Sequence, residues 1–365
     1  MTPEPVSNAR TLTRRRLLAL GGGAAALAIA GCTPETPSSG ARPDPAPSPA
    51  AKPVLRFTIG LHIEPFGTTA QGFRSGAVEG RQLDYADRTF FERQSEDIRA
   101  VAAIVEQHSG RMTVQAQSPF TSAVIARGSS ILRELAAAGH EIALHFHEDA
   151  HLGPSSASLP VGRWTAVLEE ELDLLRRASG VDRIRSWSGG NLYPRVYEAA
   201  AAAGLEVNSD WKNPASQSTP LELTGVNPWR PAGGTDGTGF SAFSRHDPAG
   251  PVIFLPEGAY DREDFASARR GGQFGGDEAY FAYLGERLRA SLAASRADRV
   301  NVYHFTIHPG EFRGSAAAPF AVIDRFLAES VGPLVAAGDV TWATFSAMAD
   351  AFIAWERANP GTAPK

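Results

Sequence analysis

The chain of 365 residues has one cysteine, no apolar run long enough to cross a membrane and no excess of basic residues. The single cysteine, Cys32, excludes a disulfide framework and a cysteine-based zinc site. The uncharged run at residues 17–31 is shorter than the roughly 20 residues that a membrane-spanning helix needs. With 35 basic against 40 acidic residues, the net charge of −5 argues against a broad nucleic-acid surface. We therefore expect a globular protein that does not bind nucleic acid.

The N-terminus has the layout of an export signal. Three arginines, Arg14 to Arg16, precede the uncharged run, which ends in Ile-Ala-Gly followed by Cys32. A basic stretch, a short apolar core and small residues are typical of a signal peptide. The adjacent arginines resemble a twin-arginine signal, and the last four residues resemble a bacterial lipobox. We therefore expect residues 1–31 to be removed after passage through the twin-arginine export machinery. The alternatives are an uncleaved anchor or a fortuitous cysteine.

The lipobox resemblance makes Cys32 the lipidated first residue of the mature protein. It implies an anchor on the outer face of the bacterial cytoplasmic membrane, in the cell envelope. Residues 32–53 follow, rich in Pro, Ser and Ala and without a large apolar residue. Such a composition cannot form a core and predicts a tether. The globular domain is expected to span residues 54–365.

Strands and helices alternate through that domain. Apolar and β-branched segments predict strands at 55–64, 112–116, 141–147, 184–187, 205–208, 252–255, 300–308 and 340–342. Amphipathic segments predict helices at 96–107, 130–138, 164–178, 194–203, 277–294, 319–331 and 344–357. This order indicates an α/β fold with a parallel sheet, and the number of units favours a (β/α) barrel over an open sheet. Residues 213–250, rich in Gly, Pro, Ser and Thr, are expected to cross one face of the domain.

Polar side chains gather where three of the predicted strands end. Residues two apart on a strand share a face. This alternation groups His62 with Glu64, His145 with His147, and His304 with Thr306 and His308. His151 follows one helical turn after His147. Because the carboxyl ends of barrel strands meet at one rim, where active sites lie, we expect these side chains to converge.

Imidazole and carboxylate together are the ligands of zinc and similar divalent ions. A His–Glu pair, a His-x-His pair and one further histidine can supply three ligands and leave a position for water. Such a site makes a nucleophile from water near neutral pH. His304, deeper in its strand, is expected to be a hydrogen-bonded core residue, and His140, ahead of its strand, a helix-end or surface residue.

Several motifs resemble the polysaccharide deacetylase family, of the carbohydrate esterase family 4 type. The stretch Gly139-His140-Glu141-Ile142 leading to His145 looks like the strand that precedes the family's metal motif. The segments Ser186 to Gly190 and Asn208 to Trp211 resemble its third and fourth motifs. Tyr303 to Phe312 looks like its last motif, which supplies a catalytic histidine. The resemblance covers nearly the whole domain in order and implies a distorted (β/α) barrel, typically with seven strands.

Three motifs depart from the family pattern. The first motif has paired aspartates, whereas this chain has His62 and Glu64. In the second motif, alignment places His145 first and Asp149 where a histidine belongs, and the H-x-x-x-H spacing is kept by His147 and His151. In the third motif Ser188 replaces an arginine, so that partner of a metal ligand is expected to be missing. These changes leave metal binding in place and weaken the prediction of ordinary sugar deacetylation.

The resemblance implies roles for the rim residues in a metal-dependent hydrolase of amide bonds that deacetylates N-acetylated polysaccharide. Glu64, His147 and His151 are expected to bind a divalent metal, zinc, with His145 or His62 as a substitute or additional ligand. His62, Asp149 or Glu148 is expected to take a proton from water, and His308 to protonate the leaving amine. Trp187, Asp210 and Trp211 are expected to contact the sugar; for the tryptophans the alternative is core packing.

Two other classes of function stay open. A non-catalytic lipoprotein could use the same barrel to bind glycan or metal. A glycoside hydrolase would need two facing carboxylates, for which Glu64 with Glu257 or Glu311 are candidates. Acetate release, glycan binding without turnover, and release of reducing ends distinguish the three.

Overall fold

A computed structural model describes most of the predicted globular domain. The described residues are 52–64, 85–153, 155–190, 193, 195–210, 221–233, 240–260, 276–311 and 320–365. Backbone contacts divide the chain into two units, Met1–Pro49 and Ala50–Lys365, and all described residues belong to the second. The predicted signal peptide, Cys32 and all but the last two residues of the predicted tether lie outside the described residues.

The core of the domain is a parallel sheet. Its strands are β1 (Leu55–His62), β2 (Thr113–Ala116), β3 (Glu141–Phe146), β4 (Ser186–Gly189), β5 (Val207–Asn208), β6 (Ile253–Phe254), β7 (Asn301–Ile307) and β8 (Val340–Trp342). Seven strands follow one another in the order β6-β5-β4-β3-β2-β1-β7, and β8 pairs with the first residues of β1. The sheet curls into a half-barrel with helices outside it, which confirms the predicted distorted (β/α) barrel with seven strands.

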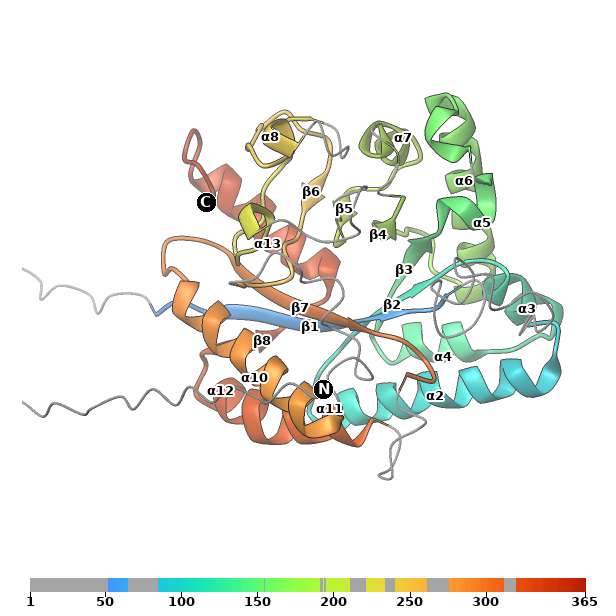
Figure 1. Cartoon of the computed structure of the whole chain (residues 1–365), viewed down its shortest axis with the longest axis horizontal. Coiled ribbons are helices and arrows are strands. Elements are labelled where there is room, and N and C mark those ends of the chain that lie inside the picture. The colour runs from blue at the N-terminus through green and yellow to red at the C-terminus, as the bar shows by residue number, and fades with distance from the viewer. Residues whose placement is uncertain are drawn as a thin grey trace, which may run out of the picture. The chain divides into compact units, whose positions relative to one another are not determined.

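Helices connect the strands and cover the outside of the sheet. They are α2 (Arg88–Gln107), α3 (Phe120–Ala126), α4 (Ile131–Ala137), α5 (Glu148–Leu152), α6 (Val161–Ser179), α7 (Val196–Ala202), α8 (Phe240–Phe243), α10 (Asp277–Ala294), α11 (Ala321–Phe326), α12 (Gly332–Ala336) and α13 (Phe345–Ala358). In Figure 1, α2, α10 and α11 lie on one side of β1 and β7, and α6 flanks β3. Within the described residues, no helix combines the length and apolar character that a membrane crossing requires.

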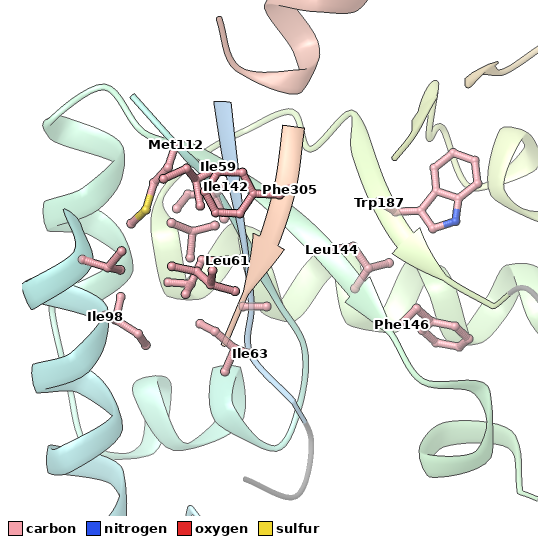
Figure 2. Close-up of a cluster of buried hydrophobic side chains, with 14 of the residues drawn as sticks. Ile59, Leu61, Ile63, Ile98, Met112, Ile142, Leu144, Phe146, Trp187 and Phe305 are labelled. Carbon is pink, nitrogen blue, oxygen red and sulfur yellow. The ribbon is translucent and has the colours of Figure 1, made fainter. Parts of the chain in front are cut away.

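Alternation along β1 separates a hydrophobic outer face from a polar interior. Figure 2 shows Leu61 and Ile63 pointing towards Ile98 on α2. All three side chains are fully buried. Residues in between, including His62 and Glu64, therefore face the inside of the barrel. Both are 3% exposed, so the barrel interior contains buried polar groups rather than an apolar core.

Helix α2 begins eight residues before its predicted start. The side chain of Asp87 accepts a hydrogen bond from the backbone N–H of Phe90 at 2.7 Å and caps the helix. Three polar residues of the first half, Gln94, Ser95 and Asp97, are buried. They interrupt the apolar period on which the prediction depended.

Part of the segment between β5 and β6 closes the gap between β6 and β7. Trp229 bridges Phe254 of β6 in an antiparallel manner, and the carbonyl of Val226 accepts a hydrogen bond from Val302 N of β7 at 2.7 Å. The expectation that residues 213–250 cross one face of the domain was therefore wrong for residues 225–231. They lie at the open edge because the unpaired backbone groups of β6 and β7 need hydrogen-bond partners.

The amino end of the barrel is closed by α13. The carboxylate of Glu141, at the start of β3, accepts hydrogen bonds from Thr113 Oγ1, Ser186 Oγ, Ser346 N and Ser346 Oγ at 2.5–3.1 Å. Two of these donors belong to the first turn of α13, where a negative charge is favourable. Glu141 thus joins three strands to the last helix.

Candidate metal centre

Glu64, His145 and His147 meet at the carboxyl ends of β1 and β3. Nε2 of His147 lies 2.6 Å from Oε2 of Glu64, and Nε2 of His145 lies 3.5 Å from the same oxygen. One ligand atom from each residue falls within 4.8 Å of the other two. Alternation on two strands therefore brings three ligands to one point, as expected from the sequence for Glu64 and the His-x-His pair.

The donor set fits a divalent metal ion. Oε2 of Glu64 and Nε2 of His145 are buried, and neither makes a hydrogen bond of ordinary distance and angle within the described part of the chain. Such groups are costly to bury unless something else satisfies them. One carboxylate and two imidazoles, with room for water, are the ligand set of a catalytic zinc site.

The electrostatics keep two of the ligands, Glu64 and His145, in their metal-binding forms. Burial alone raises the pKa of Glu64, but His147 and His145 outweigh it and hold the pKa well below its ordinary value. Burial lowers the pKa of His145 to about 4, against the opposing effect of Glu64. An ionised carboxylate and a neutral imidazole are the forms that bind a metal.

Ser188 of β4 fixes the orientation of the His145 ring. Its Oγ lies 2.7 Å from Nδ1 of His145, its register partner in β3, and both residues are buried. The next residue, Gly189, has φ 88°, and a Cβ there would collide with the carbonyl of Phe146. Glycine thus lets β4 approach β3 closely. The expected absence of a partner at position 188 was wrong, because a serine this near reaches the ring directly.

His308, at the end of β7, contacts the other oxygen of Glu64. Its Nε2 lies 3.1 Å from Oε1 of Glu64, and its Nδ1 lies 3.5 Å from Oε2 of Glu311. The same Glu311 oxygen accepts the backbone N–H of His308 at 2.9 Å. Burial alone lowers the pKa of His308, but Glu311 and Glu64 outweigh it and raise the pKa. His308 is therefore suited to carry a proton.

His62 packs against both His145 and His308. It stacks on His145, with ring centroids 4.0 Å apart and an interplanar angle of 24°. It meets His308 edge-on at 5.6 Å. His62 therefore lies beside both a candidate ligand and the candidate acid, as the strand pattern predicted.

His151 lies outside the three-ligand group. Its Nε2 is 2.8 Å from Oε1 of Gln117 and its Nδ1 is 3.6 Å from Oε1 of Glu171. The H-x-x-x-H spacing thus places the second histidine in the last turn of α5, where both ring nitrogens face other groups. No feature of the sequence singled out Gln117, which lies just after β2.

The structure describes two of the three expected sugar-binding residues, and one of them, Trp187, lies in the core. Trp187 is fully buried and packs edge-on against Tyr197, so it presents no face to a sugar. It faces the helices because its neighbours Ser186 and Ser188 point inward. Asp210 is buried just after β5. Trp211 and the side chain of Asp149 lie outside the described residues.

The remaining polar candidates have structural surroundings. His304 is fully buried, and its Nε2 lies 3.2 Å from the carbonyl of Leu255, as predicted for a core residue. His140 is buried as well, because Met112 N donates to it and Glu106 lies 3.0 Å away. Of the two expected positions, the helix end is confirmed, since His140 N donates to the carbonyl of Leu135 in α4 at 3.0 Å, and the surface position was wrong.

Comparison with known proteins supports the fold. No protein-family model and no curated protein matches the sequence. The chain is similar to a protein from Mycobacterium smegmatis assigned to the polysaccharide deacetylases, with 16% identity, a TM-score of 0.52, and coverage of 89% of this chain and 96% of that one. It is also similar to 4-alpha-glucanotransferase from Thermococcus litoralis, with 16% identity, a TM-score of 0.50, and coverage of 82% and 41%, respectively. A pseudoenzyme of carbohydrate esterase family 4 from Bacillus anthracis matches at 9% identity and a TM-score of 0.39, over 82% of this chain and 66% of that one. The chain therefore has a divergent form of the polysaccharide deacetylase fold.

Proposed function

We propose that the chain is a metal-dependent hydrolase of amide C–N bonds that removes acetyl groups from N-acetylated cell-surface or extracellular polysaccharide. The observation that carries this proposal is the convergence of Glu64, His145 and His147, with His308 on the second oxygen of Glu64. Two imidazoles, one carboxylate and a proton-carrying histidine are the groups that hydrolysis of an unactivated amide requires.

Glu64, His145 and His147 would hold the divalent cation, zinc by their chemistry, which when bound supplies Lewis-acid polarisation of a carbonyl and acidification of water. Ser188 holds the His145 ring in place at Nδ1, which leaves Nε2 for the cation. Glu64 keeps its charge because two imidazoles face it.

His308 serves as the general acid. Glu311 accepts its backbone N–H and faces Nδ1, while Nε2 points to Glu64. Two carboxylates on opposite nitrogens raise the pKa of His308, so a proton is held at Nε2 until the leaving amine accepts it. The same arrangement disfavours glycoside hydrolysis by Glu64 and Glu311, since the imidazole occupies the space between the two carboxylates.

The acceptor of the water proton is one of three residues. His62 lies against both His145 and His308, and Glu148 is buried at the start of α5. Asp149 follows in the same helix. We favour His62, because its ring belongs to the described cluster. Asp210 and Trp211, which follow β5, are proposed to contact the sugar.

A non-catalytic glycan- or metal-binding protein is the second candidate. It is favoured by one feature of the site: His62 stands where the resemblance places an aspartate base. A barrel that retains its ligands without a carboxylate base would bind without turnover.

Metal content and acetate release distinguish the two candidates. The purified full-length chain should bind about one zinc ion, and Glu64→Gln and His147→Ala should lose it. Acetate release from an N-acetylated glucosamine oligomer should require the metal and should fall in His308→Ala by about 10²–10⁴-fold. Metal binding together with glycan binding and no acetate would establish the second candidate. A wild-type chain that binds none of zinc, cobalt, manganese and nickel would refute the hydrolase and favour a glycan-binding protein.

We further propose that the mature protein is lipid-anchored at Cys32 on the outer face of the cytoplasmic membrane. This rests on the arginines, the short apolar run and the lipobox-like residues alone. Mass spectrometry of the mature N-terminus should find a lipidated Cys32, and Cys32→Ser should release the domain from the membrane fraction. An unmodified N-terminus that retains residues 1–31 would refute the proposal.

A further inference from the structure

Gln117 connects the ends of the two strands that carry the metal ligands. It is fully buried and lies just after β2, between β1 and β3 in the sheet. Its Oε1 accepts the backbone N–H of His147 at 3.0 Å, and its Nε2 lies 3.5 Å from the carbonyl of Ile63, the residue before Glu64. One amide thus contacts the backbone at or beside two of the three ligands.

The amide orientation determines which ring nitrogen of His151 carries hydrogen. A backbone N–H can only donate, so the Gln117 atom that faces His147 N is the oxygen. Nε2 of His151, which lies 2.8 Å from the same oxygen, must therefore donate as well. A ring nitrogen that carries hydrogen has no lone pair in the ring plane to offer to a metal. Nε2 of His151 is thus not a ligand in this arrangement.

The other nitrogen of His151 faces a carboxylate that is itself held in place. Nδ1 lies 3.6 Å from Oε1 of Glu171, and Glu171 accepts hydrogen bonds from Ser118 N and Ser118 Oγ at 2.7 and 2.6 Å. The ring stacks on Phe146, with centroids 5.0 Å apart and an interplanar angle of 15°. The His151 backbone N–H donates to the carbonyl of His147 at 3.2 Å. The His151 ring therefore contacts Gln117, Glu171 and Phe146, and none of these belongs to the ligand cluster.

We propose that Gln117, His151 and Glu171 form a positioning chain for His147, and that His151 is not a metal ligand. The proposal rests on the proposed metal centre. In this proposal the H-x-x-x-H spacing fixes the backbone of His147. Its N–H donates to Gln117, and its carbonyl accepts the backbone N–H of His151. Groups that orient a ligand in this way typically change metal affinity by about 10–100-fold when they are removed.

The test compares two substitutions at one position in the full-length chain. In His151→Gln the new side-chain amide donates to Gln117 but is a poor zinc ligand, whereas His151→Leu removes the hydrogen bond. Affinity for Co²⁺ and its visible absorption spectrum are measured for both, followed by competition with Zn²⁺. His140→Leu, which replaces a buried histidine before the amino end of β3, is the matched control. Thermal unfolding of each metal-free variant measures its folding.

The positioning chain predicts a different result for each variant. His151→Gln should retain Co²⁺ affinity within about threefold and the wild-type spectrum, and His151→Leu and Gln117→Leu should each lose about 10–100-fold with the spectrum unchanged. The double variant should lose no more than either single one, because both break the same chain. A changed spectrum and an equal loss in His151→Gln and His151→Leu would overturn the proposal and make His151 a ligand. If the wild type binds no Co²⁺ or Zn²⁺, the metal centre itself is refuted, and the positioning role with it.

Discussion

Ser188 provides a sharp test of the site, because a neighbouring serine supplies its control. Ser188→Ala deletes the hydroxyl 2.7 Å from Nδ1 of His145 in a fully buried setting. A buried polar group left without a partner costs about 1–3 kcal/mol. The metal-free protein should therefore lose about that much free energy of unfolding.

The same deletion should weaken metal binding. Removal of the group that orients a ligand costs about 10–100-fold in affinity. At about 1.4 kcal/mol per tenfold, this range is about 1.4–2.8 kcal/mol, close to the stability cost.

Ser186→Ala is the matched control. Ser186 lies two residues earlier on β4, is equally buried, and donates to Glu141 at 2.8 Å at the other end of the barrel interior. Urea unfolding should show a similar loss for both variants, whereas titration with Zn²⁺ should show weaker binding for Ser188→Ala alone. Unchanged affinity in Ser188→Ala, or equal loss in both variants, would refute the role of Ser188 in orienting His145.

Three further predictions concern other parts of the domain. Because the Trp187 ring is in the core, Trp187→Ala should lower the free energy of unfolding by about 3–5 kcal/mol. Trp187→Phe should leave KM for the glycan unchanged. A raised KM in Trp187→Phe would show that the ring contacts the sugar. Burial lowers the pKa of His140 against the opposing effect of Glu106, so the unfolded chain binds more protons below the ordinary pKa. The stability that the neutral ring contributes is present above about pH 6.5 and is lost as the pH falls towards the lowered pKa. Urea unfolding should therefore show a stability gap between wild type and His140→Asn that shrinks from pH 8 to pH 5, and a constant gap would contradict this. Free zinc at a hundred times its Kd should stabilise the wild type by about 2.7 kcal/mol over the chelated form, and calorimetry of Glu64→Gln should show no such shift.

Strand alternation was sufficient to predict the ligand side of the site. His62 and Glu64, and His145 and His147, are two residues apart on buried strands, so each pair had to share a face. The same rule, applied to Ser186-Trp187-Ser188, assigns the tryptophan to the helix side, because both serines point inward. The family motif predicted that Trp187 contacts the sugar, whereas strand alternation predicts that it packs in the core.

The positioning residues could not be predicted from spacing. Gln117 contacts the ends of β1 and β3 through the register of three parallel strands, and single residues of a strand do not reveal that register. His151 has the spacing of a ligand, yet the amide oxygen of Gln117 and the carboxylate of Glu171 face its two nitrogens. Interactions between segments far apart in the sequence determine which histidine is free to bind.

The contact between Glu141 and α13 has a consequence for the order of assembly. A nascent chain that ends at residue 344 has all eight strands but lacks Ser346, which provides two of the four donors to the Glu141 carboxylate. Without α13 that carboxylate lies at an open end of the barrel, where water competes for its hydrogen bonds with Thr113 and Ser186. The hydrogen bonds that join β2, β3 and β4 at this end are completed only by a helix that follows all eight strands in the sequence. Truncation before residue 345 should therefore weaken the barrel at the end opposite the metal centre.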